Sequence, residues 1–222
     1  MKRLLLLLPL TLSAQVPLSL DTWFNDPLLH GSTVRVSYDN EAFRTVAAGQ
    51  FRATSPDGSW ITYCTDLGNV LSSGLFKAIP LPLATDPLTQ NPDWVVGGIG
   101  RATQAVAFFG GQVSTPQEAS ALQLIVWELL YDTSPSFAAG SLRAQDGGIL
   151  GTVSLATTWL NDPGWPQEPL EGATWWMPAN YLGEYREAQG LIGHVPEAGT
   201  WGAVGVGLVA MGWVVVKRGG GK

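Results

Sequence analysis

Residues 115–131, TPQEASALQLIVWELLY, hold the clearest structural signal in the chain. Thr115, Pro116 and Glu118 have the order of a capping box with proline in the first helical turn, which predicts a helix starting at Pro116. From Ala119 to Tyr131 the segment is apolar nearly all round, so we expect this helix to be buried on most sides. The rest of the domain must therefore enclose it.

Helices are also expected on both sides of this segment. Residues 93–109 repeat apolar side chains at three- and four-residue spacing and end at a pair of glycines. Residues 149–160 form a third helical pattern, which stops at Pro163. The sequence thus predicts a helical region in the middle of the chain.

Strand patterns precede and follow the helices. Alternating apolar and polar residues predict strands at 32–38, 50–54 and 60–66, the last two joined by a tight turn. Residues 76–83 contain two prolines and are expected at a sheet edge, and residues 173–177 return as a strand. This order predicts an α+β fold: an antiparallel β-sheet or sandwich with an inserted helical region.

The composition of the chain argues against one class of function. The chain has 222 residues, room for one ordinary domain plus short segments, and 14% of them are charged. Residues 15–194 carry seven basic and seventeen acidic side chains, a net charge of −10. Such an acidic surface argues against binding nucleic acid.

The first fourteen residues have the pattern of a secretory signal peptide. Lys2 and Arg3 precede an apolar run that is too short to span a bilayer, and Ser13 and Ala14 supply the small residues of a cleavage site. We expect cleavage after Ala14 and export of residues 15–194. The alternative is a buried N-terminal strand.

The C-terminal residues predict a single transmembrane helix. Trp201 to Val216 carries no charge and measures roughly 24 Å as a helix, close to the thickness of a bilayer core. Lys217 and Arg218 follow it and should hold the C-terminus in the cytoplasm. The alternative is a core helix.

Val195, Pro196 and Glu197 stand just before this apolar segment. Together with the basic end, residues 195–222 resemble the PEP-CTERM sorting signal of Gram-negative bacteria. Ala198 departs from the second proline of that motif. The resemblance implies recognition by an exosortase-type membrane enzyme and delivery to the cell surface, often in organisms that make exopolysaccharide.

Cys64 and Gln123 are the residues most suggestive of chemistry. Cys64 is the only cysteine, so it is a buried apolar residue, an intermolecular partner or a reactive thiol. Gln123 lies in the apolar helix, where an unpartnered amide is costly. Either the backbone of a neighbouring strand satisfies this amide, or the Cys64 thiol displaces ammonia from it and forms a thioester. In the second case both side chains should face the buried seam between strand 60–66 and the helix.

The segments around Cys64 and Gln123 resemble the thioester adhesin domains of Gram-positive surface proteins. Gln123 and Trp127 match the Thr-Gln-any-Ala-Ile-Trp motif, whereas Leu122 and Ile125 depart from it. Gln104 is a rival glutamine without a tryptophan at the matching spacing. The resemblance implies a covalent bond to a partner. The same pattern also resembles exported domains that precede PEP-CTERM tails, for which no chemistry is implied.

Other sites are poorly supported. The two histidines, His30 and His194, stand near the ends of the exported segment, which argues against a cysteine hydrolase and a zinc site. The acidic residues form no calcium-binding loop, and we expect neither a metal nor a cofactor.

Tryptophans gather late in the domain and suggest a glycan-binding platform; they are Trp159, Trp165, Trp175 and Trp176.

Three functions follow. The first is an exported cell-surface or extracellular-matrix protein, sorted by its tail, with a structural or interaction role and no catalysis. The second is a covalent adhesin with a Cys64–Gln123 thioester, and the third is a glycan-binding module. The expected partners are an exosortase-type enzyme, the membrane and surface glycans such as exopolysaccharide.

Overall fold

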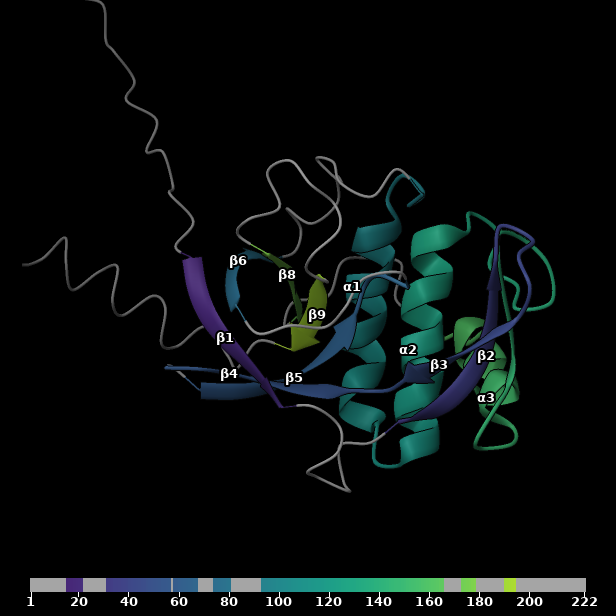
Figure 1. Cartoon of the computed structure of the whole chain (residues 1–222), viewed down its shortest axis with the longest axis horizontal. Helices are drawn as coiled ribbons and strands as arrows, with labels where there is room; N and C mark the ends of the chain where they lie inside the picture. The colour runs from purple at the N-terminus through teal and green to yellow at the C-terminus, as the bar shows by residue number, and fades with distance from the viewer. Residues whose placement is uncertain are drawn as a thin grey trace, which may run out of the picture.

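The structure, a computed structural model, describes residues 15–21, 31–56, 58–67, 74–80, 93–165, 173–178 and 190–194. In these ranges two antiparallel sheets flank a pair of long helices, as Figure 1 shows. The architecture is α+β, as the sequence predicts. Within the described ranges, no helix combines the length and the apolar character needed to cross a bilayer. The predicted signal peptide and the predicted membrane helix 201–216 lie outside them.

Six strands form a closed antiparallel barrel. Its order is β1-β4-β5-β9-β8-β6. The strands are β1 (Gln15–Asp21), β4 (Phe51–Ser55), β5 (Gly58–Cys64), β6 (Gly74–Pro80), β8 (Ala173–Pro178) and β9 (Leu191–His194). The predicted hairpin is confirmed, since β4 pairs with β5 from Ser55–Gly58 to Phe51–Thr62.

The remaining strands form a second sheet of order β3-β2-β7. They are β2 (Ser32–Tyr38), β3 (Arg44–Ala48) and β7 (Leu142–Asp146). Val34 and Val36 are fully buried and Arg35 is exposed, which is the alternation expected for β2. Ser37, a polar residue of the same alternation, is nevertheless buried, and it donates its hydroxyl to the Glu41 carbonyl.

The sheet arrangement corrects two sequence-based predictions. The strands do not form one sheet or a sandwich, because six of them close on themselves and three stand apart. β6 is not at a sheet edge, since it pairs with β1 on one side and β8 on the other. Its proline Pro80 is the last residue of the strand, where a missing N–H removes no interior hydrogen bond.

The helices are α1 (Gly98–Phe109), α2 (Pro116–Tyr131) and α3 (Thr152–Leu160), with a short 3₁₀ turn η2 (Gly110–Gln112) after α1. α2 begins where predicted, because Thr115 accepts the Glu118 N–H and the Glu118 carboxylate accepts the Thr115 N–H. α1 begins later than expected: its first turn follows Gly97, which has φ 76°. α3 also begins later, after Gly151.

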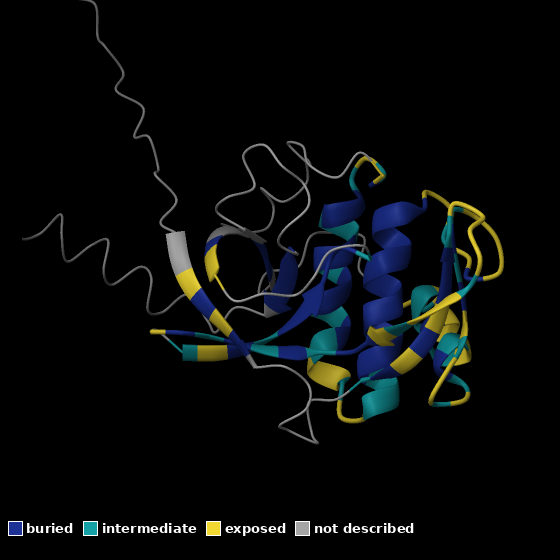
Figure 2. Cartoon of the chain, viewed as in Figure 1, coloured by how far each residue is buried: buried dark blue, intermediate teal, exposed yellow. Residues whose placement is uncertain are grey.

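α2 lies at the centre of the domain and is buried from Ala119 onward, where Figure 2 shows it dark blue, while its first turn is partly exposed. Every residue from Ala119 to Tyr131 is buried, which confirms the prediction of a helix enclosed on most sides. α1 packs beside it and contacts β8 and β9 of the barrel, while α2 contacts β2 and β3 of the small sheet. Burying such large apolar side chains contributes roughly 1.5 to 3 kcal/mol each to stability.

Candidate functional site

The candidate site begins at the end of β5. Cys64 pairs with Leu191 of β9 on one side, whereas β4 on the other side ends its pairing at Phe51–Thr62. The N–H and C=O of Cys64 therefore lie beyond the last residue pair between β4 and β5, and β4 offers them no hydrogen-bond partner. Buried backbone groups in such a position need partners from outside the sheet.

Gln123 of α2 supplies both partners. The Cys64 N–H donates to Gln123 Oε1 at 2.9 Å, and Gln123 Nε2 donates to the Cys64 carbonyl at 2.8 Å. The Gln123 side chain is fully buried. Its amide thus continues the β5 ladder as a neighbouring strand would, which confirms the expected hydrogen bonds from the strand backbone.

The Cys64 thiol points away from the seam between β5 and α2. It packs in an apolar cluster to which all six barrel strands contribute, so the cluster is the barrel interior. Its neighbour Tyr63 packs in the other cluster, with the helices. This differs from the expectation that both side chains face the seam, and the reason is the alternation of side chains along a strand.

Burial determines the state of this thiol. Cys64 is 5% exposed, and both burial and the nearby Asp66 carboxylate raise its pKa well above the ordinary value. The group is therefore a protonated thiol near neutral pH. A thiol in this state is a weak nucleophile until a base removes its proton.

Polar side chains surround the end of β5 beyond Cys64. Thr65 is fully buried and Asp66 is 2% exposed. The Thr65 N–H donates to the Gly190 carbonyl at 3.0 Å, and Asp66 Oδ2 accepts from the Gly190 N–H at 3.4 Å. Trp175 Nε1 is buried without a hydrogen-bond partner. This polar cluster, Thr65, Asp66, Trp175 and Gly190, lies directly beside Cys64.

Asp66 is one of the acidic residues for which the sequence shows only the absence of a calcium-binding loop. Its position two residues after Cys64 was the available signal, since residues i and i+2 of an extended segment share a face. Gln104, the rival glutamine, lies in α1, whereas the glutamine that binds the Cys64 backbone is Gln123 of α2. In the described part of the chain, no three His, Cys, Asp or Glu side chains gather as a metal site would require.

Two of the four late tryptophans, Trp175 and Trp176, are buried and offer no exposed platform. Trp175 and Trp176 are each only 2% exposed, and Trp176 stacks on Trp60 at 4.9 Å inside the barrel. Trp159 lies parallel to Phe109 with their ring centroids 4.9 Å apart. Trp175 and Trp176 are core residues, whereas Trp159 and Trp165 are partly buried and pack against the core.

The residues of the predicted sorting tail lie outside the described ranges: Val195, Pro196, Glu197, Trp201, Val216, Lys217 and Arg218.

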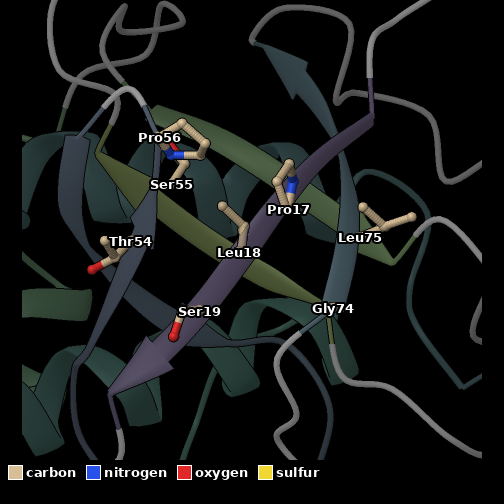
Figure 3. Close-up of a pocket in the computed structure, with 8 residues that line it drawn as sticks. All are labelled: Pro17, Leu18, Ser19, Thr54, Ser55, Pro56, Gly74 and Leu75. Carbon is tan, nitrogen blue, oxygen red and sulfur yellow. The ribbon is translucent and has the colours of Figure 1, made fainter.

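A shallow hollow lies on the barrel, where β1, the β4–β5 turn and the start of β6 meet (Figure 3). It is lined by small and apolar residues that include Pro17, Pro56 and Leu75, and by neither Cys64 nor Gln123. It is not part of the candidate site.

Comparison with known proteins gives few matches. No protein-family profile matches the chain, and no curated protein does. Among solved structures, the N-terminal thioester domain of a surface protein from Clostridium perfringens is similar, with a TM-score of 0.44 and 14% identity. That similarity covers 73% of this chain and 98% of the other. A cysteine-to-alanine mutant of that domain gives a TM-score of 0.43 and 13% identity over the same shares. A likeness this distant carries no argument about function.

Proposed function

We propose that this chain is an exported surface protein whose folded domain attaches covalently to a partner through an internal thioester, with Cys64 as the thiol and Gln123 as the acyl donor. The observation that carries the proposal is the buried Gln123 amide held directly against the main chain of Cys64. The domain uses the bond once per molecule, so we do not propose an enzyme. It needs no metal or cofactor for this step.

The hydrogen bonds of Gln123 suit this reaction. Thiolate attack on the amide carbon places negative charge on Oε1, which already accepts the Cys64 N–H. The C–N bond then breaks, and Nε2 leaves as ammonia from its place beside the Cys64 carbonyl. The reaction brings the sulfur to about 3 to 3.5 Å from the amide carbon, which requires the Cys64 side chain to rotate out of the barrel interior.

The thioester would then serve as a stored electrophile. An amine or hydroxyl of the partner attacks the acyl carbon, the C–S bond breaks, and the Cys64 thiol is restored. The partner is left joined to residue 123 by an amide or an ester. Burial of both side chains suits this storage, because water that reached the acyl group would hydrolyse it first.

Mass spectrometry of the purified protein tests the bond. A thioester makes the intact chain about 17 Da lighter than its sequence, by the loss of one ammonia. We expect the deficit in the wild type and its absence in Cys64→Ala and Gln123→Ala. A wild type of full mass would leave a non-covalent interaction role as the better account.

Glutamine variants locate the acyl donor. Gln104→Ala and Gln189→Ala are the controls, the second because residue 189 precedes Gly190, whose carbonyl accepts the Thr65 N–H. We expect both to keep the deficit. If Gln189→Ala loses it and Gln123→Ala keeps it, the pairing with Gln123 is wrong and Gln123 only supports the strand.

We also propose that residues 1–14 direct export and that the PEP-CTERM-like tail anchors and sorts the protein through an exosortase-type enzyme. The sequence layout supports this: Val195, Pro196 and Glu197, the apolar segment 201–216, then Lys217 and Arg218. Replacing Lys217 and Arg218 with glutamate should disturb orientation and processing, because the positive-inside bias is lost. Unchanged localisation and processing would contradict the proposal.

A further inference from the structure

Formation of a thioester at Cys64 requires a proton to move from the thiol to the leaving nitrogen. The thiol must lose a proton inside a dry interior, and the leaving nitrogen must gain one. The Cys64 side chain is 5% exposed and the Gln123 side chain is fully buried, so bulk water does not reach either group freely. A protein group beside Cys64 has to carry the proton.

We propose that Asp66 is this group: its carboxylate takes the proton from the Cys64 thiol and delivers it to the leaving nitrogen. The inference rests on the proposed thioester but not on which glutamine is the acyl donor. It assigns a catalytic residue to bond formation.

The backbone places Asp66 on the side of Cys64. The antiparallel ladder between β5 and β9 continues past Cys64, because the Thr65 N–H donates to the Gly190 carbonyl at 3.0 Å. Side chains two residues apart in such an extended segment point to the same side. The Gly190 N–H, which donates to Asp66 Oδ2 at 3.4 Å, then ties this carboxylate to the residue just before Leu191, the cross-strand partner of Cys64.

The surroundings of Asp66 suit a proton carrier. Asp66 is 2% exposed, and the Thr65 hydroxyl and the Gly190 N–H both reach Oδ2 only at the long distance of 3.4 Å. The charge of Asp66 also acts on the thiol directly, since it contributes to the raised pKa of Cys64.

Other ionisable groups near the site are less suitable. Burial raises the pKa of Tyr131 and of Tyr63, so both phenols stay protonated and cannot serve as the base at neutral pH. Glu128 binds the Ser136 N–H and lies five residues along α2 from Gln123, so it projects from a different face of the helix. Asp66 is thus the carboxylate placed next to the thiol.

The proton balance closes without an added reactant. Asp66 accepts the thiol proton as sulfur attacks the amide carbon, and a neutral carboxyl group forms. The tetrahedral intermediate collapses as this carboxyl donates the proton to nitrogen, ammonia leaves and the carboxylate is restored. One S–H and one C–N bond break, and one C–S and one N–H bond form.

Refolding kinetics test the role of Asp66. Unfolded, reduced chains with an intact amide are refolded, and the loss of about 17 Da is followed in time by mass spectrometry. We expect Asp66→Asn to fold but to form the bond at least about a hundredfold more slowly, the usual contribution of a positioned acid or base. The exposed Asp39→Asn variant is the matched control and should match the wild type.

A pH profile separates a catalytic role from a structural one. In the wild type the rate should rise with pH as the Asp66 carboxyl ionises, and this dependence should be lost in Asp66→Asn. Equal rates and equal pH profiles in the two proteins overturn the proposal for Asp66. A wild type that never loses about 17 Da overturns the thioester itself, which is a separate failure. If Asp66→Asn does not fold, Asp66→Ser takes its place with the same two outcomes.

Discussion

The amide of Gln123 replaces a missing strand beside Cys64. Its two hydrogen bonds, 2.9 Å from the Cys64 N–H and 2.8 Å to the Cys64 carbonyl, have the lengths of ordinary ladder bonds. The residues are 59 positions apart in sequence, so this contact joins the central helix to the barrel. A buried polar group within an apolar helix thereby fixes how α2 sits on β5.

Replacing Gln123 should therefore destabilise the fold whether or not a thioester forms. Gln123→Ala leaves the Cys64 N–H and C=O buried without partners, at about 1 to 3 kcal/mol for each group. Urea denaturation of the variant measures this loss. Gln117→Ala is the matched control, because Gln117 on the same helix donates to the Leu150 carbonyl at an exposed site. An equal loss in both variants would contradict the role of Gln123.

Glu128 should make stability depend on pH in the opposite direction from an ordinary carboxylate. It is fully buried, and burial raises its pKa to about 8 against the downward effect of the Ser136 N–H and of Arg101. Between its unfolded pKa of about 4.3 and this folded value, the folded state holds a proton that the unfolded state has lost. The free energy of unfolding should therefore fall as pH rises through this window, by a few kcal/mol at most.

Urea titrations at pH 5 and pH 8 measure this effect. Glu128→Gln keeps a neutral group in place and should remove most of the decrease. Glu118→Gln is the control: hydrogen bonds from Ser114 and Thr115 lower the pKa of Glu118, so its contribution is lost only as pH falls below the unfolded value. A wild type that is equally stable at both pH values would show that Glu128 is not protonated in the fold.

The N-terminal cap of α2 should contribute measurably to the free energy of unfolding. Thr115→Ala removes the acceptor of the Glu118 N–H and should cost about 0.5 to 2 kcal/mol. Thr157→Ala in α3 is the comparison, since the Thr157 hydroxyl only donates back to Val153 on an exposed face. Thermal unfolding of both variants tests the difference, and a Thr115→Ala protein with an unchanged Tm would contradict it.

Local sequence signals predicted the elements better than their assembly. The α2 cap and the β4–β5 turn depend on neighbouring residues, so both could be located from sequence. Barrel closure depends on β1 pairing with β6 and on β9 pairing with both β5 and β8, which are contacts between distant segments. β9 is four residues long, too short for a clear alternation.

In the candidate site, too, some features could be predicted from local sequence and others depend on the assembled fold. Gln123 could be identified because a polar residue in an apolar helix needs a partner, and Cys64 because it is the single cysteine. The direction of the Cys64 thiol depends on which face of β5 lines the barrel, and that face is set only when the sheet closes. Asp66 does not stand out in the sequence, because the Gly190 N–H that donates to its carboxylate comes from a segment far along the chain, just before β9.

The chain passes close to Thr65 at Gly190, the residue just before β9. A Cβ added at Gly190 would lie 2.5 Å from Thr65 Oγ1 and 3.2 Å from Trp175 Nε1. Thr65 is fully buried and cannot move aside freely, so Gly190→Ala should destabilise the protein by about 1 to 3 kcal/mol. Gly111→Ala is the control, since nothing lies within 4 Å of a Cβ there.

A double variant shows whether this clash is the cause. Thr65→Ala removes the hydroxyl that the new Cβ meets, so Gly190→Ala should cost less in that background than in the wild type. Urea denaturation of the four proteins gives the coupling between the two positions, which we expect at about 0.5 kcal/mol or more because the residues touch. If the two losses in the free energy of unfolding simply add, the destabilisation by Gly190→Ala does not come from the contact with the Thr65 side chain.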